Sequence, residues 1–218
     1  MIMPHPIFET MTTALVGPET AFEWKLFFTF LHLLVDTGTP VSPDALAQAL
    51  HCSRDEVLGT LRLYPEAEYD PEGNLVGLGL TLRPTVHQFF LGDRTFYTWC
   101  APDALSFPIM LQRPARIVST CPVTGTRIQV TVTPDYIEDL EPASAIVSIA
   151  KDGIWLRKLK DTGCIRQGGC NHQFFFSSPE VAAPWFSEHP DFIALPVKEA
   201  FPGMREFAKH IQARAAQA

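Results

Sequence analysis

Residues 42–82 constrain the fold most, because their helix and turn signals occur in a fixed order. Ser42 begins a short helix, and Ser53 with Glu56 forms a capping box that begins a second one. A hairpin follows, with its turn at residues 70–74. Two short helices and a hairpin in this order predict a winged helix.

A longer helix is expected to precede this unit. Residues 20–37 carry apolar side chains almost all round the helix, and Gly38 and Pro40 end it, so the helix should be buried. We therefore predict an N-terminal winged-helix-like domain over residues 1–84.

The charge of this part argues against DNA binding. The chain of 218 residues has 17 Lys and Arg against 24 Asp and Glu, a net charge of −7. Residues 1–90 contain 4 basic and 11 acidic residues, which accounts for the whole excess. DNA binding depends on basic side chains that displace counterions from phosphate. We therefore expect the winged helix to be a scaffold with no nucleic-acid partner.

The pattern changes to strands after residue 84, and we predict a second domain over residues 85–218. The expected elements are hairpins at 87–99 and 116–133, helices at 101–108 and near 134–140, a strand at 145–149, a loop at 151–171, a strand at 172–177, a helix after 178, a strand at 192–197 and a helix at 198–216. These indicate an α+β fold: a mixed, mostly antiparallel sheet with flanking helices, packed against the winged helix.

The five cysteines are expected to be thiols in the cytoplasm. The first 20 residues include Glu9 and Glu19 and lack the basic region of a secretory signal. No apolar run is long enough for a membrane span, so no membrane partner is expected. A reducing compartment keeps cysteines unpaired, and an odd number fits this interpretation.

Cys100 is the first candidate for chemistry, because it falls between an expected strand and an expected helix. Free N–H groups at a helix start favour a thiolate, and Asp103 lies on the same side one turn later. A thiol beside a carboxyl can exchange a proton with it. We expect desolvation by Trp99 and Phe107 to oppose the helix dipole at Asp103. A buried structural cysteine is the alternative interpretation.

Cys164 and Cys170 lie in a glycine-rich stretch and form a second candidate. Arg166 between them could stabilise a thiolate, and sulfur donors suit a soft metal ion such as Hg(II), Cu(I) or Zn(II). Their spacing is not that of a zinc knuckle, so a loop with incidental thiols is equally possible. Cys52 and Cys121 have no close partner in the sequence, which favours structural roles.

Several segments, in this order, resemble the bacterial organomercurial lyases, also called alkylmercury lyases. The matching segments are Tyr69-Asp70, Gly73-Asn74, Gly77 to Leu82, Tyr97 to Leu105, Phe107-Pro108, Ala115-Arg116, Val118-Ser119, Cys121, Thr124-Gly125, Arg166-Gln167, Cys170, His172, Phe175-Phe176 and Ser178. The resemblance covers roughly residues 40–210. Its most specific part is Trp99-Cys100-Ala101 with Asp103, followed by a cysteine just before a Phe-rich strand.

The resemblance implies protonolysis of a carbon–mercury bond, which yields a hydrocarbon and Hg(II). It implies that Cys100 and Cys170 bind mercury, that Asp103 relays the proton, and that no cofactor is needed. Cys164 has no counterpart in the family; it is a third sulfur ligand, a relay for Hg(II), or incidental. The implied partners are an organomercurial, small cytosolic thiols, and mercuric reductase as acceptor of Hg(II).

Two other functions fit the same residues. A metal-responsive regulator would join the winged helix to the thiols, although the negative charge opposes this. A carrier of soft metals would use the thiols without cleaving a bond.

Overall fold

The N-terminal part contains three helices where the sequence predicts them. The computed structural model describes residues 21–151 and 165–217, and its first helices are α2 (Ala21–Thr37), α3 (Pro43–Leu50) and α4 (Arg54–Leu61). The Ser42 hydroxyl accepts a hydrogen bond from the Ala45 N–H, and both halves of the capping box between Ser53 and Glu56 are present. Leu63 follows α4 and is 62% exposed, so it does not share the buried face of the helix that Val57 and Leu61 form.

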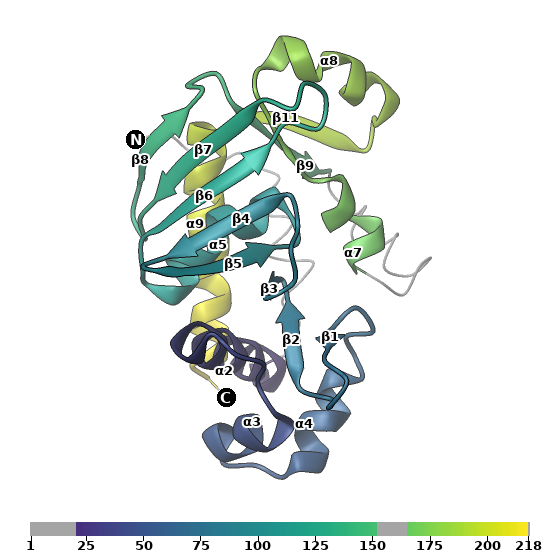
Figure 1. Ribbon diagram of the computed structural model, residues 1–218, viewed down its shortest axis with the longest axis vertical. Coiled ribbons are helices and arrows are strands. Elements are labelled where there is room, and N and C mark those ends of the chain that lie inside the picture. The colour runs from purple at the N-terminus through teal and green to yellow at the C-terminus, as the bar shows by residue number, and fades with distance from the viewer. Residues whose placement is uncertain (1–20, 152–164, 218) are drawn as a thin grey trace.

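A two-stranded wing follows the helices and continues into a large sheet (Figure 1). We call β1 (Glu68–Tyr69), β2 (Leu75–Leu78) and the predicted turn between them the wing. Gly79 has a φ of +77°, which suits glycine, and the chain reverses there into β3 (Leu80–Thr81). β3 pairs with β5 (Arg94–Thr98), so a single sheet joins the wing to the C-terminal part.

The large sheet has 8 strands in the order β1-β2-β3-β5-β4-β6-β7-β8. Its other strands are β4 (His87–Leu91), β6 (Ala115–Thr120), β7 (Arg127–Val132) and β8 (Ile137–Glu141). A 3-stranded sheet, in the order β10-β9-β11, contains β9 (Ile146–Ala150), β10 (Phe175–Phe176) and β11 (Phe192–Pro196). The α+β class is confirmed, but every pairing between described strands is antiparallel, so the sheet is not mixed.

The prediction of a short helix near residues 134–140 is wrong, because β8 lies there. Ile137 and Leu140 are three residues apart, which suits one face of a helix as well as an edge strand. In the structure they pair with Val132 and Val130 of β7. Pairing with a distant strand thus decides a segment whose local pattern is ambiguous.

The helix after Cys100 is longer than predicted. α5 (Ala101–Leu111) continues past Pro108, which cannot donate the main-chain hydrogen bond of that turn. Nearly all of its side chains are buried, and this burial compensates for the missing hydrogen bond.

The expected loop at 151–171 is only partly described. Residues 152–164 lie outside the described chain, and then come α7 (Ile165–Gly168) and a single 3-10 turn at Cys170–His172. The strand expected at 172–177 is reduced to β10. The last two helices, α8 (Pro179–Glu188) and α9 (Val197–Ala215), confirm the prediction.

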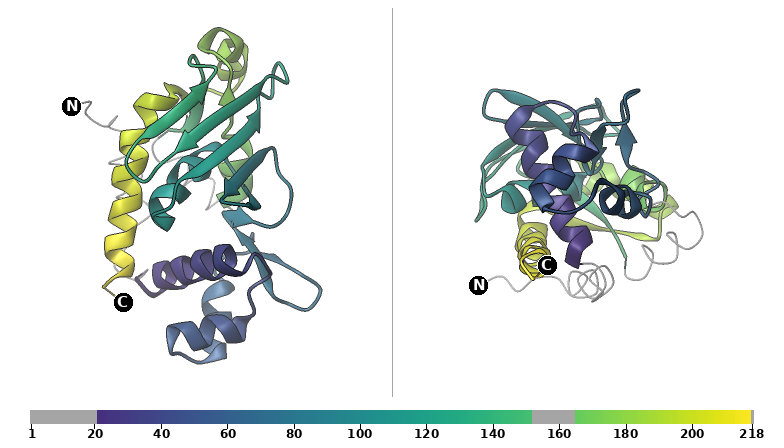
Figure 2. Two further views of the ribbon diagram at one scale, coloured as in Figure 1. Left: turned by 60° about the vertical axis from the view of Figure 1, so that its left-hand side comes forward. Right: turned by 90° about the horizontal axis from the view of Figure 1, so that it is seen from below.

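Helices α5 and α9 lie side by side on one side of the large sheet, and α2 crosses α9 near its C-terminal end (Figure 2). The start of α5 therefore lies where the sheet, α9 and the N-terminal helices converge.

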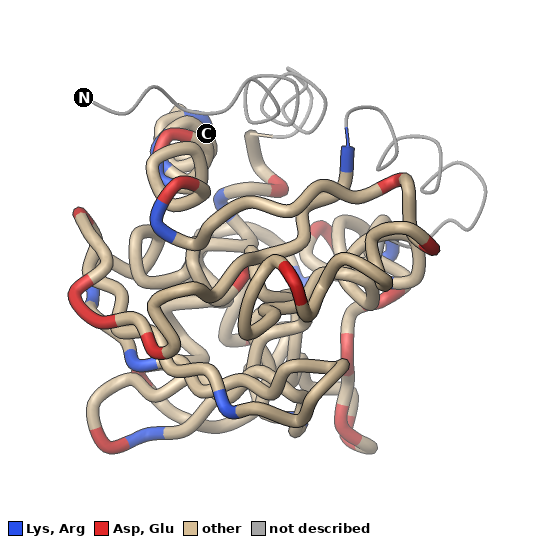
Figure 3. The backbone as a smooth tube through the Cα atoms, turned by 90° about the horizontal axis from the view of Figure 1, so that it is seen from above, with Lys and Arg blue, Asp and Glu red and all other residues tan. Residues whose placement is uncertain are grey.

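Charged side chains do not gather at one end of the molecule. Seen from the end opposite the winged helix, Lys and Arg lie at scattered points between Asp and Glu (Figure 3). No helix within the described ranges is long and apolar enough to cross a membrane.

Candidate active site

Cys100 occupies the N-cap position of α5, directly after β5. Its backbone is extended, with φ −146° and ψ 169°, and its Sγ accepts a hydrogen bond of 3.5 Å from the Asp103 N–H. The main-chain N–H of Trp99 donates a hydrogen bond to the Gly79 carbonyl. The Thr98 hydroxyl donates a hydrogen bond to the Cys100 carbonyl. These bonds fix the sulfur at the point where strand becomes helix.

Asp103 lies at the third position of α5 and reaches back to the cap. The thiol and the main chain of Cys100 both lower the pKa of its carboxyl, so the two residues interact across the first turn of the helix. The Cys100 sulfur caps the Asp103 N–H as the hydroxyl of an ordinary N-cap residue would. The second carboxylate oxygen, Oδ2, is buried and has no hydrogen-bond partner among the described residues. That oxygen is available to a bound molecule.

Cys170 comes from a segment that is distant in the sequence, and Gln173 ties it to Cys100. The Gln173 N–H donates to the Cys170 carbonyl at 3.1 Å, and the Gln173 carbonyl accepts from the Ala101 N–H at 3.0 Å. The buried ring of His87, whose Nδ1 lies 2.8 Å from the Ser119 hydroxyl, also interacts with the Gln173 main chain, which raises its pKa against the larger effect of burial. One main-chain carbonyl thus joins the two cysteine segments. Nothing in the local sequence indicated this role for Gln173 or His87, because both contacts are long-range.

The structure brings together three of the four residues predicted for the site. The sulfurs of Cys100 and Cys170 and a carboxylate oxygen of Asp103 all lie within 4.8 Å of one another. Cys164 lies outside the described residues. In the part of the chain that is described, no other group of three His, Cys, Asp or Glu could hold a metal ion.

Burial raises the pKa of each member of this group. Burial raises the pKa of Cys100 well above its ordinary value, and its hydrogen bond to Cys170 adds to the effect. That bond lowers the pKa of Cys170, but burial and the charge of Asp103 outweigh it, and the pKa is raised. The Asp103 N–H at the helix start lowers the pKa of Cys100, as expected, but desolvation is the larger effect.

Burial also raises the pKa of Asp103, to about 6, against the hydrogen bonds from Cys100 that lower it. The expectation that desolvation opposes the helix dipole is confirmed, and Trp99 and Phe107 both line the cavity beside the carboxyl. A carboxyl with this pKa can hold a proton and can also release it near neutral pH.

The three residues open into an apolar cavity of about 180 Å³. Its wall combines side chains from three helices: Trp24 and Phe27 of α2, Phe107 and Met110 of α5, and Met204 and Phe207 of α9. Engineered cavities of about 150 Å³ bind benzene. The space beside the sulfurs can therefore accept a small hydrocarbon group.

Two family profiles match the chain, one after the other. The profile described as "Alkylmercury lyase" matches residues 80–209. The profile described as "Helix-turn-helix domain of alkylmercury lyase" matches residues 7–79. Together they account for most of the chain.

Curated relatives and a solved structure agree with the profiles. The alkylmercury lyase of Pseudomonas putida is 43% identical over 176 residues, which cover 81% of this chain and 79% of the relative. That of Streptomyces lividans is 38% identical over 191 residues, covering 88% and 86%. A crystal structure of the mercury-bound form of MerB2 has the same fold, with a TM-score of 0.71, 24% identity, and coverage of 94% of this chain and 97% of that one. The chain therefore belongs to the alkylmercury lyase family of enzymes.

Proposed function

We propose that this protein cleaves the carbon–mercury bond of organomercurials by protonolysis, with Cys100 and Cys170 binding mercury and Asp103 relaying the proton. The observation that carries this proposal is the cluster of two sulfurs and one carboxylate oxygen within 4.8 Å at the end of an apolar cavity. Family membership supports the same reaction.

Mercury binding uses the soft donors of the site. Sulfur prefers soft metal ions, so the two cysteines select mercury over the harder cations of the cell. The substrate R–Hg⁺ would place its mercury between the sulfurs and its group R in the cavity. Each thiol loses its proton when its sulfur bonds to mercury, and one of these protons passes to the Asp103 carboxylate.

The proton relay removes the main barrier to cleavage. When the carbon–mercury bond breaks, its electron pair stays on carbon, and an unprotonated leaving group would be a carbanion. Asp103 donates its proton to that carbon, which leaves as the hydrocarbon R–H. Hg(II) remains bound to the two sulfurs, and Asp103 is again a carboxylate. No cofactor takes part in these steps.

Release of the product requires an acceptor with sulfur ligands. A small thiol, or a dithiol on a partner such as mercuric reductase, would displace Cys100 and Cys170 one at a time. Such an exchange proceeds through mixed intermediates, as in thiol–disulfide exchange. Turnover should therefore depend on added thiol.

The test is hydrocarbon release from phenyl- or methylmercury with excess small thiol, measured in the headspace. Cys100→Ser and Cys170→Ser should each abolish release, because each removes a mercury ligand. Cys52→Ser is the matched control: Cys52 is half-buried in the helix–turn–helix turn, away from the cavity, and its loss should leave release unchanged. Wild-type protein that releases no hydrocarbon would refute the proposal.

The soft-metal carrier is the second candidate, because the same two sulfurs could hold Hg(II) without Asp103. It predicts stoichiometric Hg(II) binding and no hydrocarbon. Asp103→Asn distinguishes the two functions. If the protein is only a carrier, the variant and the wild type bind Hg(II) equally and neither releases hydrocarbon. If it is the lyase, the wild type releases hydrocarbon and the variant does not.

A further inference from the structure

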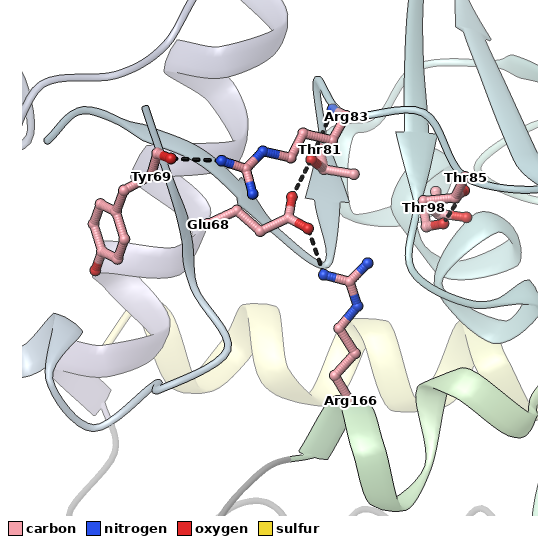
Figure 4. Close-up of polar contacts among 7 residues, drawn as sticks. All are labelled: Glu68, Tyr69, Thr81, Arg83, Thr85, Thr98 and Arg166. Carbon is pink, nitrogen blue, oxygen red and sulfur yellow. Dashed lines mark hydrogen bonds and ion pairs between the residues drawn. The ribbon is translucent and has the colours of Figure 1, made fainter. Parts of the chain in front are cut away.

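A buried carboxylate in the wing contacts the segment that carries Cys170. Glu68 of β1 is only 7% exposed, and its carboxylate accepts a hydrogen bond from the Thr81 hydroxyl and pairs with the Arg166 guanidinium (Figure 4). Arg166 belongs to α7, four residues before Cys170. The contact therefore joins the N-terminal part to the second cysteine segment.

The sheet makes room for this carboxylate by a glycine. Gly77 pairs with Glu68 on one side and with Thr81 on the other. A Cβ at Gly77 would lie 2.6 Å from the Thr81 Cβ and would overlap the Glu68 carboxylate. Glu68 can therefore reach across β2 to Thr81 and Arg166 only because residue 77 has no side chain.

Arg166 links the carboxylate to the active site. Its guanidinium carbon lies 4.9 Å from the centroid of the Trp99 ring, in a cation–π contact. Trp99 precedes Cys100 and lines the cavity. Arg166 also lowers the pKa values of Asp103 and Cys170, so its charge acts on both groups. Arg166 thus contacts Trp99, the residue before Cys100, and belongs to the same short segment as Cys170.

We infer that Glu68 is a positioning residue for catalysis, which by holding Arg166 fixes the Trp99 ring and the Cys170 segment in their catalytic arrangement. The inference rests on the proposed function for its activity readout. Removing one partner of a partly buried ion pair leaves the other uncompensated, so the arginine would leave its place when Glu68 is lost. The winged helix then serves catalysis through its wing, without contacting DNA.

The test is a double-mutant cycle with Glu68→Gln, Arg166→Gln and the double variant. For each protein, kcat and KM are measured, and kcat is divided by the concentration of protein in which both Cys100 and Cys170 are free thiols. Each single variant should lower kcat by about 10- to 100-fold, as for small misplacements of catalytic groups, with little change in KM. The double variant should be no slower than the slower single variant, because Glu68 acts through Arg166.

Arg83→Gln is the matched control. Arg83 donates a hydrogen bond of 2.6 Å to the Tyr69 carbonyl, so it stabilises the same wing without contacting Arg166. Its kcat should match the wild type. Independent, multiplicative losses in the double variant, a loss in Arg83→Gln equal to that in Glu68→Gln, or wild-type kcat in Glu68→Gln would each overturn the inference.

Two further measurements keep the outcome decisive. If Glu68→Gln does not fold, Arg166→Gln tests the link alone: its side chain is 30% exposed, and unchanged kcat would refute the inference. If the wild type releases no hydrocarbon, the proposed function fails, and the cycle is then measured on Hg(II) affinity by competition with a small dithiol. The affinity for Hg(II) should then fall in each single variant and should fall no further in the double variant, because the sulfurs of Cys100 and Cys170 must be correctly placed to bind the same ion.

Discussion

The cap of α5 uses an ordinary helix-start interaction for an unusual purpose. A serine in place of Cys100 would accept from the Asp103 N–H in the same way, but sulfur also binds mercury. The sequence predicts this pair because both residues belong to one turn. It does not predict the position of Gln173 or Glu68, whose contacts join segments far apart in the chain.

The raised pKa of Asp103 predicts a stability cost at neutral pH. Its pKa is about 6 in the folded protein against an ordinary value of 3.8. The folded state therefore binds the proton more tightly, and the free energy of unfolding falls as pH rises from about 4 to about 6. Asp103→Asn removes this cost, so the variant should be more stable than the wild type by about 3 kcal/mol well above pH 6.

Urea unfolding at about pH 4 and about pH 8 measures this difference. His87 changes stability in the opposite sense, since burial lowers its pKa to about 4 and stability is lost as pH falls below its ordinary value of 6.5. Both proteins retain His87, so its contribution cancels in the comparison. If the Asp103→Asn variant were less stable than the wild type at the higher pH, this account of Asp103 would be contradicted.

At the scale of elements, local capping signals predict helices well and edge strands poorly. α3 and α4 begin where Ser42 and Ser53 indicate, because each cap bonds within its own turn. β8 was predicted to be a helix, because its pattern alone does not reveal that β7 lies beside it. Long-range pairing is the information that a single sequence lacks.

Gly79 combines a positive φ with a close approach to another side chain, so substitution there should be costly at the scale of elements. It has a φ of +77°, and a Cβ there would lie 2.9 Å from Cζ of Phe107, a cavity residue. Gly79→Ala should lower the free energy of unfolding by about 1–3 kcal/mol from backbone strain, with a further loss from the clash. It should also raise KM for phenylmercury, because Phe107 would be displaced.

Gly73→Ala separates the two causes. Gly73 has a φ of +83°, but nothing lies within 4 Å of a Cβ there. This variant should show the strain without the clash and should retain the wild-type KM. Equal losses of stability in the two variants, measured by urea unfolding, would show that the Phe107 contact has no effect.

At the scale of the whole molecule, the wing and the C-terminal part share one sheet (Figure 1). Leu78 and Gly79, at the end of the wing, line the cavity together with residues of the C-terminal part. The sequence predicts the α+β class and the order of most elements, but it does not predict that β3 carries the sheet from one part into the other. The boundary between residues 84 and 85 remains a prediction. The contribution of α2, α5 and α9 to one cavity also became visible only in three dimensions.

The whole-molecule charge predicts that the winged helix does not bind DNA. The net charge is −7, and Arg54 at the start of α4 pairs with Asp44 at 3.3 Å. We expect no shift of duplex DNA in a gel assay at moderate salt, because few basic side chains can displace counterions. A shift that weakens steeply with added salt would favour the metal-responsive regulator instead.

The central claim is that the proton on the released hydrocarbon passes through the site from exchangeable groups. The most direct measurement is mass spectrometry of benzene released from phenylmercury in D₂O with excess thiol. The account predicts one benzene for each Hg(II) formed, carrying one deuterium, because thiol and carboxyl protons exchange with solvent. Benzene without deuterium, or Hg(II) binding without benzene, would contradict it.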